Sequence, residues 1–232
     1  MANFTVNTSK AAIEESSGGS YIGKSGIYDV TIKFASVDVS KGGAESVNFN
    51  IDYSGNSQTI YGPYIQSKAG DTLEIGMKLI NKALVIAGLR DGDVPSIEEE
   101  MHIVGKDNEE KEFAVITDLS DLDIKIRLQE EYSRHYQTGD VTKRLVIKNF
   151  FDAEGGSAQE IIDDTEKGVQ LAKDEKYKDN ITYRDSAKGA NDAPTPEDVA
   201  DWLEAKKAGT APAKGAAKPA AAKVAPKRAT FK

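Results

Sequence analysis

The sequence predicts a mainly β domain with helices, followed by a helical extension and a low-complexity tail. Three observations support this fold class: several segments alternate apolar and polar residues, one apolar segment has a helical period, and the composition changes near the C-terminus. A chain of 232 residues with 39% apolar residues can bury one main core, because domains typically contain ~100–200 residues.

Three consecutive strands are expected after a polar, flexible arm at residues 1–20. In "IYDVTIKFASVDV" apolar residues stand at every second position from Tyr28 to Phe34 and are expected to face inward, which is typical of a half-buried strand. The turn-like "SKGGAE" leads to "SVNFNIDYS", which resumes the alternation. After "SGNS", the segment "QTIYGPYI" contains Pro63, which predicts an edge strand or a strand end.

The period changes to that of a helix in "DTLEIGMKLINKALVIAG". Asp71 precedes Glu74 by three residues, the spacing of a capping box, and Gly88 is expected to end the helix. The apolar stripe of this helix is expected to be core rather than a ligand site, and it consists of Leu73, Met77, Ile80, Leu84 and Ala87.

Four further segments predict strands beyond the charged loop "RDGDVPSIEEE". These segments are "MHIVG", "EFAVITDL", "DLDIKIRLQEEY" and "TKRLVIKNFF". Three strands, a helix and further strands follow one another in an OB-fold, a small, partly open Greek-key barrel, and also in other α+β meanders. We therefore predict an OB-fold-like barrel over residues 21–156.

A helical extension is expected at residues 157–208. Within it, "APTPEDVADWLEAKKAG" predicts a short helix with Thr195 as N-cap, Pro196 at the first helical position and Gly209 as its end. Residues 209–232 are rich in Ala, Lys and Pro and cannot bury enough apolar area to order themselves, so they are predicted to be disordered.

Charge is distributed unevenly along the chain. Residues 205–232 carry eight cations and no acid, which leaves 22 basic residues against 38 acids in the rest of the chain. The body of the protein thus has a net charge of −16 and the tail one of +8. An acidic body argues against a protein coated in nucleic acid, but it is compatible with a local basic groove, because screening confines each charge to about a Debye length.

Several kinds of chemistry are excluded or disfavoured. The absence of cysteine excludes disulfides and cysteine-ligated metal sites, and two histidines are too few for the usual zinc site. We expect no enzyme, no cofactor and no metal, with acidic clusters such as "DGD" and "EEE" as solvated surface carboxylates. No segment resembles a signal peptide or an apolar membrane span of ~20 residues, so a cytoplasmic protein without membrane contact is expected.

The stretch "GGSYIGKSG" has the spacing of a phosphate-binding P-loop, from Gly18 to Ser25. A P-loop needs a buried strand before its glycines and a helix after its Lys-Ser pair. Here the preceding "KAAIEESS" is polar, and the following "GIYDVTIKF" predicts a strand. We therefore interpret this stretch as a flexible lead-in to the first strand.

A basic and aromatic concentration, "YSRHYQTGDVTKRLVIK", is the main functional signal. In an OB-fold the loop between the last two strands binds oligonucleotides, and single-strand binding combines cations with flat rings on which bases stack. The residues expected to bind single-stranded DNA are Lys33, Tyr61, Tyr64, Lys125, Arg127, Tyr132, Arg134, His135, Tyr136, Lys143, Arg144 and Lys148. Tyrosines can also fill a barrel: we expect this of Tyr53 and leave both roles open for Tyr132 and Tyr136.

Four segments of the chain resemble phage-encoded single-stranded-DNA-binding proteins that are associated with replication and recombination. They are "GIYDVTIKFASV", "KALVIAGL", "DLDIKIRLQEEY" and "LVIKNFFDAEGGSAQEI", and the resemblance covers Ser20 to Ile162. It implies an OB-like barrel, DNA binding without base preference, and partnership with a phage recombinase, helicase or polymerase. Many single-strand binders end in an acidic tail with a terminal aromatic residue, whereas here Phe231 is followed by Lys232 in a basic tail, which puts the usual recruitment peptide in doubt.

Alternatives stay open at this point. The leading hypothesis is a phage-type protein that coats and protects single-stranded DNA, and the rival is a phage structural or assembly protein with no nucleic-acid role. Two roles are considered for the basic tail: it adds attraction to DNA, or it is a spacer. Two are considered for the helix with Trp202: it docks a partner, or it folds back on the barrel. A duplex-binding or RNA-binding protein and a homo-oligomer are both compatible with these residues.

Overall fold

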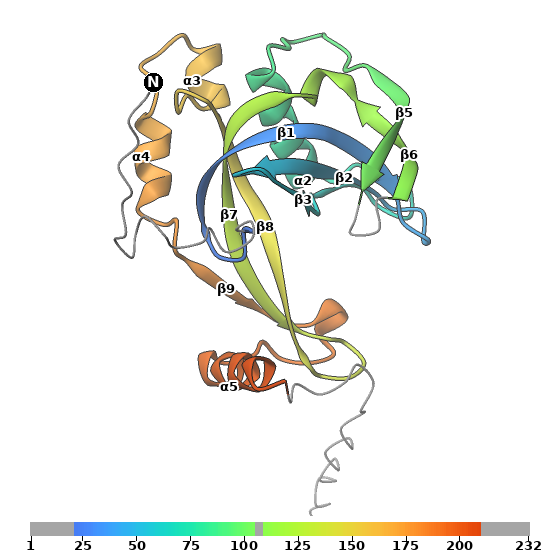
Figure 1. The fold of residues 1–232 in the computed structure, drawn as a ribbon, viewed down its shortest axis with the longest axis vertical. Coiled ribbons are helices and arrows are strands. Elements are labelled where there is room, and N and C mark those ends of the chain that lie inside the picture. The colour runs from blue at the N-terminus through green and yellow to red at the C-terminus, as the bar shows by residue number, and fades with distance from the viewer. Residues whose placement is uncertain (1–20, 105–108, 210–232) are drawn as a thin grey trace, which may run out of the picture. The chain divides into compact units, whose positions relative to one another are not determined.

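The structure is a computed structural model that describes residues 21–104 and 109–209 (Figure 1). In these residues the chain is mainly β, with an open antiparallel sheet and a few helices. The predicted class, mainly β with helices, is therefore confirmed. The predicted flexible arm, and all but the first residue of the predicted disordered tail, lie outside the described residues.

The chain divides into two compact units. Of the described residues, the larger unit contains 21–104, 109–130 and 145–181, and the smaller unit contains 131–144 and 182–209. The boundary expected at residue 156, between a barrel and a helical extension, falls inside the larger unit. The first part of the expected extension therefore belongs to the same unit as most of the strands.

The larger unit contains most of the elements. They are β1 (Gly26–Val39), β2 (Glu45–Tyr53), β3 (Asn56–Ile60), β4 (Tyr64–Gln66), α2 (Glu74–Ile86), β5 (Ile97–Val104), β6 (Glu109–Ile116), α3 (Ala158–Ile162) and α4 (Val169–Glu175). The strands that belong partly to each unit are β7 (Leu122–Arg134), β8 (Val141–Asp152) and β9 (Ile181–Arg184). The smaller unit also contains α5 (Pro196–Lys207).

The sheet is built around β1, which is 14 residues long. Five strands lie in the order β3-β2-β1-β6-β5, and β7 pairs with β1, β8 and β9. Along one edge, β1 pairs with β7 through residues 26–32 and with β6 through residues 36–37. β1 is strongly curved in Figure 1, so its two halves can have different neighbours along the same edge.

A β-bulge interrupts the alternation of β1 between Ile32 and Phe34. These two residues pair with neighbouring residues of β2, so Lys33 is one extra residue in β1. The expected inward position of Phe34 is therefore wrong. Ala35 takes the next position in the core cluster, and Phe34 is turned to the opposite face of the sheet.

The core lies on one face of the sheet and is covered by α2. Phe49 of β2 and Phe150 of β8 are fully buried, with 5.2 Å between their ring centroids. The residues that α2 contributes to the core are Ile80, Ala83 and Leu84. Tyr53, which was expected to fill the interior, is partly buried and packs edge-on against Tyr28.

The start of α2 differs from the prediction. Leu73 is the N-cap residue, and no side chain caps the helix, so the predicted capping box of Asp71 is wrong. Asp71 instead accepts a hydrogen bond from the Ser67 hydroxyl at 3.1 Å, within the turn that follows β4. Gly88 has a φ of +107° and follows the helix, as predicted.

Two strands differ from the sequence expectation. β5 begins at Ile97, inside the segment expected to be a charged loop, because residues 97–100 pair with residues 113–116 of β6. β9 was not expected at all. Its sequence "ITYR" is short and exposed at both ends, and its pairing with β7 makes it a strand.

The helices after residue 156 are confirmed in part. The segment 157–177 contains two short helices, α3 and α4, and Asp164 and Gly168 adopt positive φ angles of +49° and +90° between them. In α5, Thr195 is the N-cap and Pro196 the first helical residue, as predicted, and Thr195 forms a capping box with Asp198.

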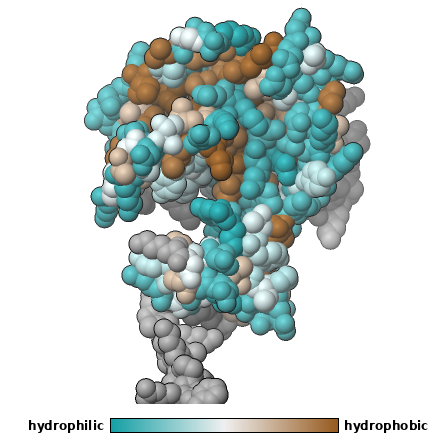
Figure 2. Space-filling view, turned by 180° about the vertical axis from the view of Figure 1, so that it is seen from behind, coloured by the Kyte–Doolittle hydropathy of each residue, from teal (hydrophilic) through white to brown (hydrophobic). Residues whose placement is uncertain are grey.

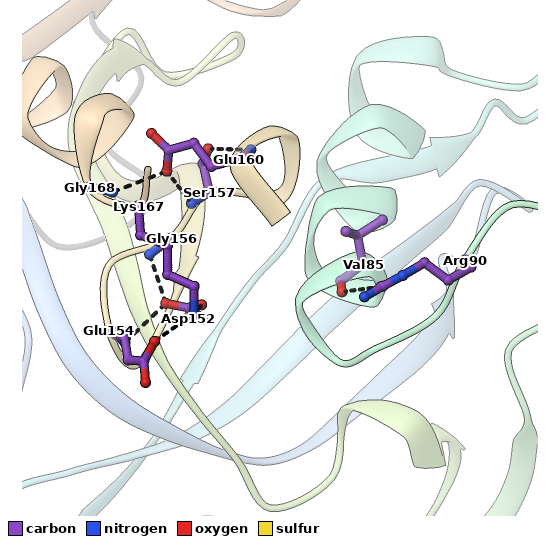
Figure 3. Close-up of polar contacts among 9 residues, drawn as sticks. All are labelled: Val85, Arg90, Asp152, Glu154, Gly156, Ser157, Glu160, Lys167 and Gly168. Atoms are coloured by element: carbon purple, nitrogen blue, oxygen red, sulfur yellow. Dashed lines mark hydrogen bonds and ion pairs between the residues drawn. The ribbon is translucent and has the colours of Figure 1, made fainter. Parts of the chain in front are cut away.

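The link between β8 and α4 is held by two carboxylates (Figure 3). Asp152 accepts hydrogen bonds from the backbone N–H groups of Glu154 and Gly156. The carboxylate of Glu160 accepts from the N–H groups of Ser157 and Gly168. Burial raises the pKa of Glu160, but these hydrogen bonds outweigh it and lower the pKa below its usual value.

The approach of α2 to β4 leads to a first prediction. A Cβ atom on Gly76 would lie 1.9 Å from the carbonyl oxygen of Tyr64, so Gly76→Ala should destabilise the fold by about 1–3 kcal/mol through overpacking, despite the higher helix propensity of alanine. The measurement is the urea midpoint of unfolding. Gly23→Ala is the control, because nothing lies within 4 Å of its added Cβ; equal midpoints for both variants would contradict the close approach.

Candidate nucleic-acid interface

A groove of about 680 Å³ lies on the outer face of β1, β2 and β3 in the larger unit. Phe34, Asn50 and Thr59 lie on this face, because Phe34 pairs with Asn50 and Asn50 pairs with Thr59 across the strands. The Thr59 hydroxyl donates a hydrogen bond to the Asn50 side-chain oxygen at 2.7 Å. The floor of the groove thus combines an aromatic ring with amide and hydroxyl groups.

The β5–β6 hairpin forms one wall of the groove. The His102 ring of β5 stacks on Phe34 with 3.8 Å between ring centroids and an interplanar angle of 11°. Its Nε2 atom lies 2.8 Å from the Glu100 carboxylate, and Phe113 of β6 packs against Phe34 at 5.1 Å. This aromatic contact fastens the hairpin to the sheet, and Ile103 and Val104 continue the wall.

Sequence reasoning missed most of this groove. Phe34 was expected in the core, and His102 was considered only as one of two histidines, too few for the usual zinc site. The alternation in "EEEMHIV" could have placed His102 on one face of a hairpin, but its contact with Phe34 depends on the bulge in β1. One predicted DNA-binding residue, Lys33, lines the groove, together with the exposed Tyr21 on its rim.

The predicted Tyr61, directly after β3, and Tyr64, at the start of β4, are accessible. Tyr61 is 75% exposed and Tyr64 is 52% exposed, on either side of the Gly62-Pro63 step that separates the two strands. Lys148 is exposed on β8. Figure 2 shows apolar residues at the surface of the molecule, interspersed with polar ones.

Two predicted cations on β7 are engaged in ion pairs within the larger unit. Lys125 pairs with Asp29, its cross-strand partner on β1. Arg127 lies 3.3 Å from Asp174 of α4 and donates to the carbonyl oxygen of Tyr177 at 3.1 Å. The Arg127 side chain is 13% exposed and that of Asp174 is 10% exposed, so this pair fixes α4 to the sheet instead of presenting a free charge.

Tyr132 is part of the interior of the smaller unit. It is 2% exposed, stacks near Tyr183 at 6.1 Å between ring centroids, and contacts Trp202 of α5 edge-on at 6.3 Å. Lys143 lies 5.8 Å from the centre of its ring. Because Tyr183 and Trp202 of the same unit cover its ring, Tyr132 offers no exposed face on which a base could stack, which argues against its predicted role in DNA binding. Trp202, predicted to bind a partner, is half-buried in the same cluster.

The hairpin end of β7 and β8 carries the other predicted residues, in the smaller unit. Arg134 lies 2.6 Å from Asp198 and donates to the carbonyl oxygen of Gly139. The His135 ring accepts a hydrogen bond from the Thr138 N–H, and Tyr136 is 51% exposed. Of these side chains, Tyr136 is the accessible aromatic one.

Arg144 shares a carboxylate with an arginine that the sequence did not suggest. Its Nε atom donates to Glu131 at 2.7 Å, and Arg184 of β9 donates to the other oxygen of the same carboxylate at 3.2 Å. The Glu131 side chain is 4% exposed, whereas those of Arg144 and Arg184 are 60% and 59% exposed. Two guanidinium groups thus balance one buried carboxylate and leave one net positive charge at the surface.

The P-loop-like stretch has no phosphate-binding geometry in its described part, residues 21–26. The Ser25 hydroxyl donates to the carbonyl oxygen of Asn180 at 2.7 Å and accepts from the backbone N–H of Glu130 at 2.8 Å. β1 begins at Gly26, so a strand follows, as predicted, where a P-loop requires a helix. Gly18 to Ser20 lie outside the described residues.

The Arg127–Asp174 pair leads to a second prediction. Arg127→Ala leaves a buried carboxylate without its cation and should lower the free energy of unfolding by about 3 kcal/mol. Replacing both partners, as in Arg127→Met with Asp174→Leu, should recover most of that loss. The check is urea unfolding, with Lys148→Ala as an exposed control expected to change stability by less than about 0.5 kcal/mol. An Arg127→Ala variant as stable as the control would show that the pair has no structural role.

Asp198 gives a pH-dependent prediction. Hydrogen bonds from the backbone N–H and hydroxyl of Thr195, together with Arg134, lower the pKa of Asp198 to about 2. Its contribution to stability is therefore complete above the unfolded pKa of about 3.9 and is lost as the pH falls toward 2. Fluorescence of the single tryptophan, Trp202 in α5, reports on this unit. The transition between pH 4 and 2 should shrink in Asp198→Asn; an unchanged transition would contradict this assignment.

Comparisons with known proteins provide no further guide to the site. In the described residues, no helix is long and apolar enough to cross a membrane, and no group of three or more His, Asp or Glu side chains could hold a metal ion. The chain matches no protein-family model and no curated protein. A functional proposal for this protein therefore depends on its own geometry.

Proposed function

We propose that this protein binds single-stranded DNA without base specificity in the groove on the outer face of β1, β2 and β3. The observation that carries the proposal is that this groove lies on the face of β2 and β3, the second and third strands of the chain. Oligonucleotides bind OB-folds on the face of strands 2 and 3 and at the loops next to it. A groove on the equivalent face, lined by rings, hydrogen-bonding groups and a lysine, supports the same use here.

The strand order supports an OB-type barrel. Reading across the pairs β3-β2, β2-β1, β1-β7 and β7-β8 gives the order expected for five barrel strands, with α2 between the third and the fourth. The β5–β6 hairpin is then an insertion between the helix and the fourth strand. Among the described strands β3 pairs with β2 alone, so the barrel we propose is partly open.

The chemistry of the groove suits bases better than a dense row of phosphates. Tyr21 and His102 offer flat surfaces, and base–aromatic stacking contributes ~1–3 kcal/mol per base. Among the described residues that line the groove, Lys33 is the one Lys or Arg, so this lining offers few phosphate contacts. Binding should then depend on salt less steeply than in single-strand binders with long basic tracks, because each neutralised phosphate adds ~0.7 to the slope.

The smaller unit offers a second contact of the same kind. The loop between β7 and β8 corresponds to the last loop of an OB-type barrel, which also contacts oligonucleotides. Arg144 and Arg184 present exposed guanidinium groups beside it, and Tyr136 presents an exposed ring. In our proposal these side chains contact phosphates and bases in addition to the groove.

The biological role that follows is stoichiometric rather than catalytic. We propose that the protein coats and protects single strands in the cytoplasm of a bacterial host during replication or recombination of phage DNA. A phage recombinase, helicase or polymerase would be the partner enzyme. This part of the proposal rests on the resemblance of the sequence to phage single-strand binders.

A titration tests the proposal directly. Purified protein is added to a fluorescent dT oligonucleotide and to a duplex of equal length, at low and moderate salt. We expect tighter, salt-sensitive binding to the single strand. Lys33→Gln should weaken this binding and reduce the salt slope by about 0.7. Tyr21→Ala, which removes an exposed ring that lines the groove, should weaken it by ~1–3 kcal/mol through lost stacking.

The control for these variants is Lys78→Gln, which removes an exposed lysine of α2 that does not line the groove. It should bind like the unaltered protein. Equal losses in Lys33→Gln and Lys78→Gln would indicate a general charge effect and remove the groove as the site. No binding of any oligonucleotide at low salt would remove the proposed function and favour a phage assembly or protein-interaction role.

A further inference from the structure

Three strands of the smaller unit bring a charged cluster together on one face. β7 pairs with both β8 and β9, and its Glu131 lies between Arg144 of β8 and Arg184 of β9. Nε of Arg144 donates to Oε1 of Glu131 at 2.7 Å, and Nη1 of Arg184 donates to Oε2 at 3.2 Å. Because the two guanidinium groups meet at one carboxylate, a single small anion can contact both.

This face is not the one that α5 covers. Successive side chains of a strand point to opposite faces, so Glu131 and Tyr132 lie on different sides of β7. The Tyr132 ring packs against Tyr183 and against Trp202 of α5. On the other side, the Arg144 and Arg184 side chains are 60% and 59% exposed, although the carboxylate that holds them is 4% exposed.

The cluster carries more positive charge than its carboxylate requires. One arginine balances Glu131, and the second leaves a net positive charge. By the same alternation, the other side chains on this face are those of Ser133, Thr142 and Thr182, and the Ser133 and Thr142 hydroxyls lie 3.1 Å apart. Among the strand residues that the structure describes in this unit, Glu131 is therefore the one acid on this face.

The arrangement suits a phosphate group with a free end. Guanidinium groups donate in a fixed fork that matches phosphate oxygens. Because Glu131 holds both arginines in place, less side-chain freedom is lost when a ligand binds. A phosphomonoester carries a charge of about −1.5 to −2 at pH 7 and three acceptor oxygens. A phosphodiester inside a strand carries a single charge, so it gains less from two arginines.

We propose that Arg144 and Arg184, positioned by Glu131, form a binding site for a phosphomonoester. The ligand that we assign to this site is the terminal phosphate of a single DNA strand. This assignment rests on the proposed function, whereas the site itself does not. The protein then binds a strand with a phosphorylated end more tightly than the same strand with hydroxyl ends.

Calorimetric titration of the full chain with phenyl phosphate tests the site without DNA. Phenyl sulfate is the matched probe, because it has the same ring and a single negative charge. Phenyl phosphate should bind more tightly than phenyl sulfate to the unaltered protein, and at least about tenfold more weakly to Arg184→Gln than to the unaltered protein. Glu131 keeps Arg144 as its partner in this variant, and Arg144→Gln, which leaves Arg184, should have the same effect.

The control is Lys207→Gln, which removes an exposed lysine of α5 and should bind phenyl phosphate like the unaltered protein. Equal losses in Arg184→Gln and Lys207→Gln would indicate a general charge effect and overturn the site. Equal affinity for phenyl phosphate and phenyl sulfate, or no binding of phenyl phosphate, would also overturn it.

The dT titration tests the assignment to strand ends. An oligonucleotide with a phosphate at its 5′ or 3′ end should bind several-fold more tightly than one with hydroxyls at both ends. Arg184→Gln should remove this difference, and Lys207→Gln should retain it. Equal affinities for phosphorylated and unphosphorylated strands would overturn the assignment without affecting the proposed function. Binding of phenyl phosphate without any binding of dT would support the site and reject the proposed function together with the assignment.

Discussion

One extra residue in β1 decides the shape of both faces of the sheet. The bulge at Lys33 moves the following residue from the core face to the outer face, so Ala35 packs in the interior while Phe34 faces the groove. The first half of β1 pairs with β7, and the residues beyond the bulge pair with β6. Without the bulge, Phe34 would not face the His102 ring, and the β5–β6 hairpin would lose the stacking that joins it to β1.

Charge neutralisation explains why so many predicted binding residues are committed elsewhere. A buried carboxylate is costly unless a cation and hydrogen bonds satisfy it. The buried Asp174 pairs with Arg127, and the buried Glu131 pairs with Arg144 and Arg184. The partly exposed Asp198 likewise pairs with Arg134. In a chain with more acids than bases, arginines on strands are needed for these pairs before any are available for phosphate. Arg144 and Arg184 differ from the other arginines, because two exposed cations share the single carboxylate of Glu131 and one positive charge is left unbalanced.

The lining of the groove suggests how an acidic protein could hold a nucleic acid, as we propose. Rings and amide groups, rather than a row of lysines, dominate the lining of the groove, so affinity would come from stacking and shape.

Local pattern determined much of this protein. Period-two alternation identified β1, β2, β7 and β8, and helix-capping residues identified α5, because these signals depend on neighbours only a few residues apart. The candidate cations and tyrosines were also visible as a concentration of residue types. The pattern could not identify β9, whose four residues are a strand only because β7 lies beside them.

Tertiary structure alone decided which of those cations and tyrosines are exposed and unpaired enough to contact a ligand. The burial of Tyr132, the pairing of Arg127 with a helix 47 positions later and the contact of Phe34 with His102 each join residues far apart in the sequence. Side-chain burial and charge pairing are properties of the assembled core, so no local window contains them. The sequence by itself thus determined the class of fold and the kinds of side chain, whereas packing determined where the groove lies and which charges remain at the surface.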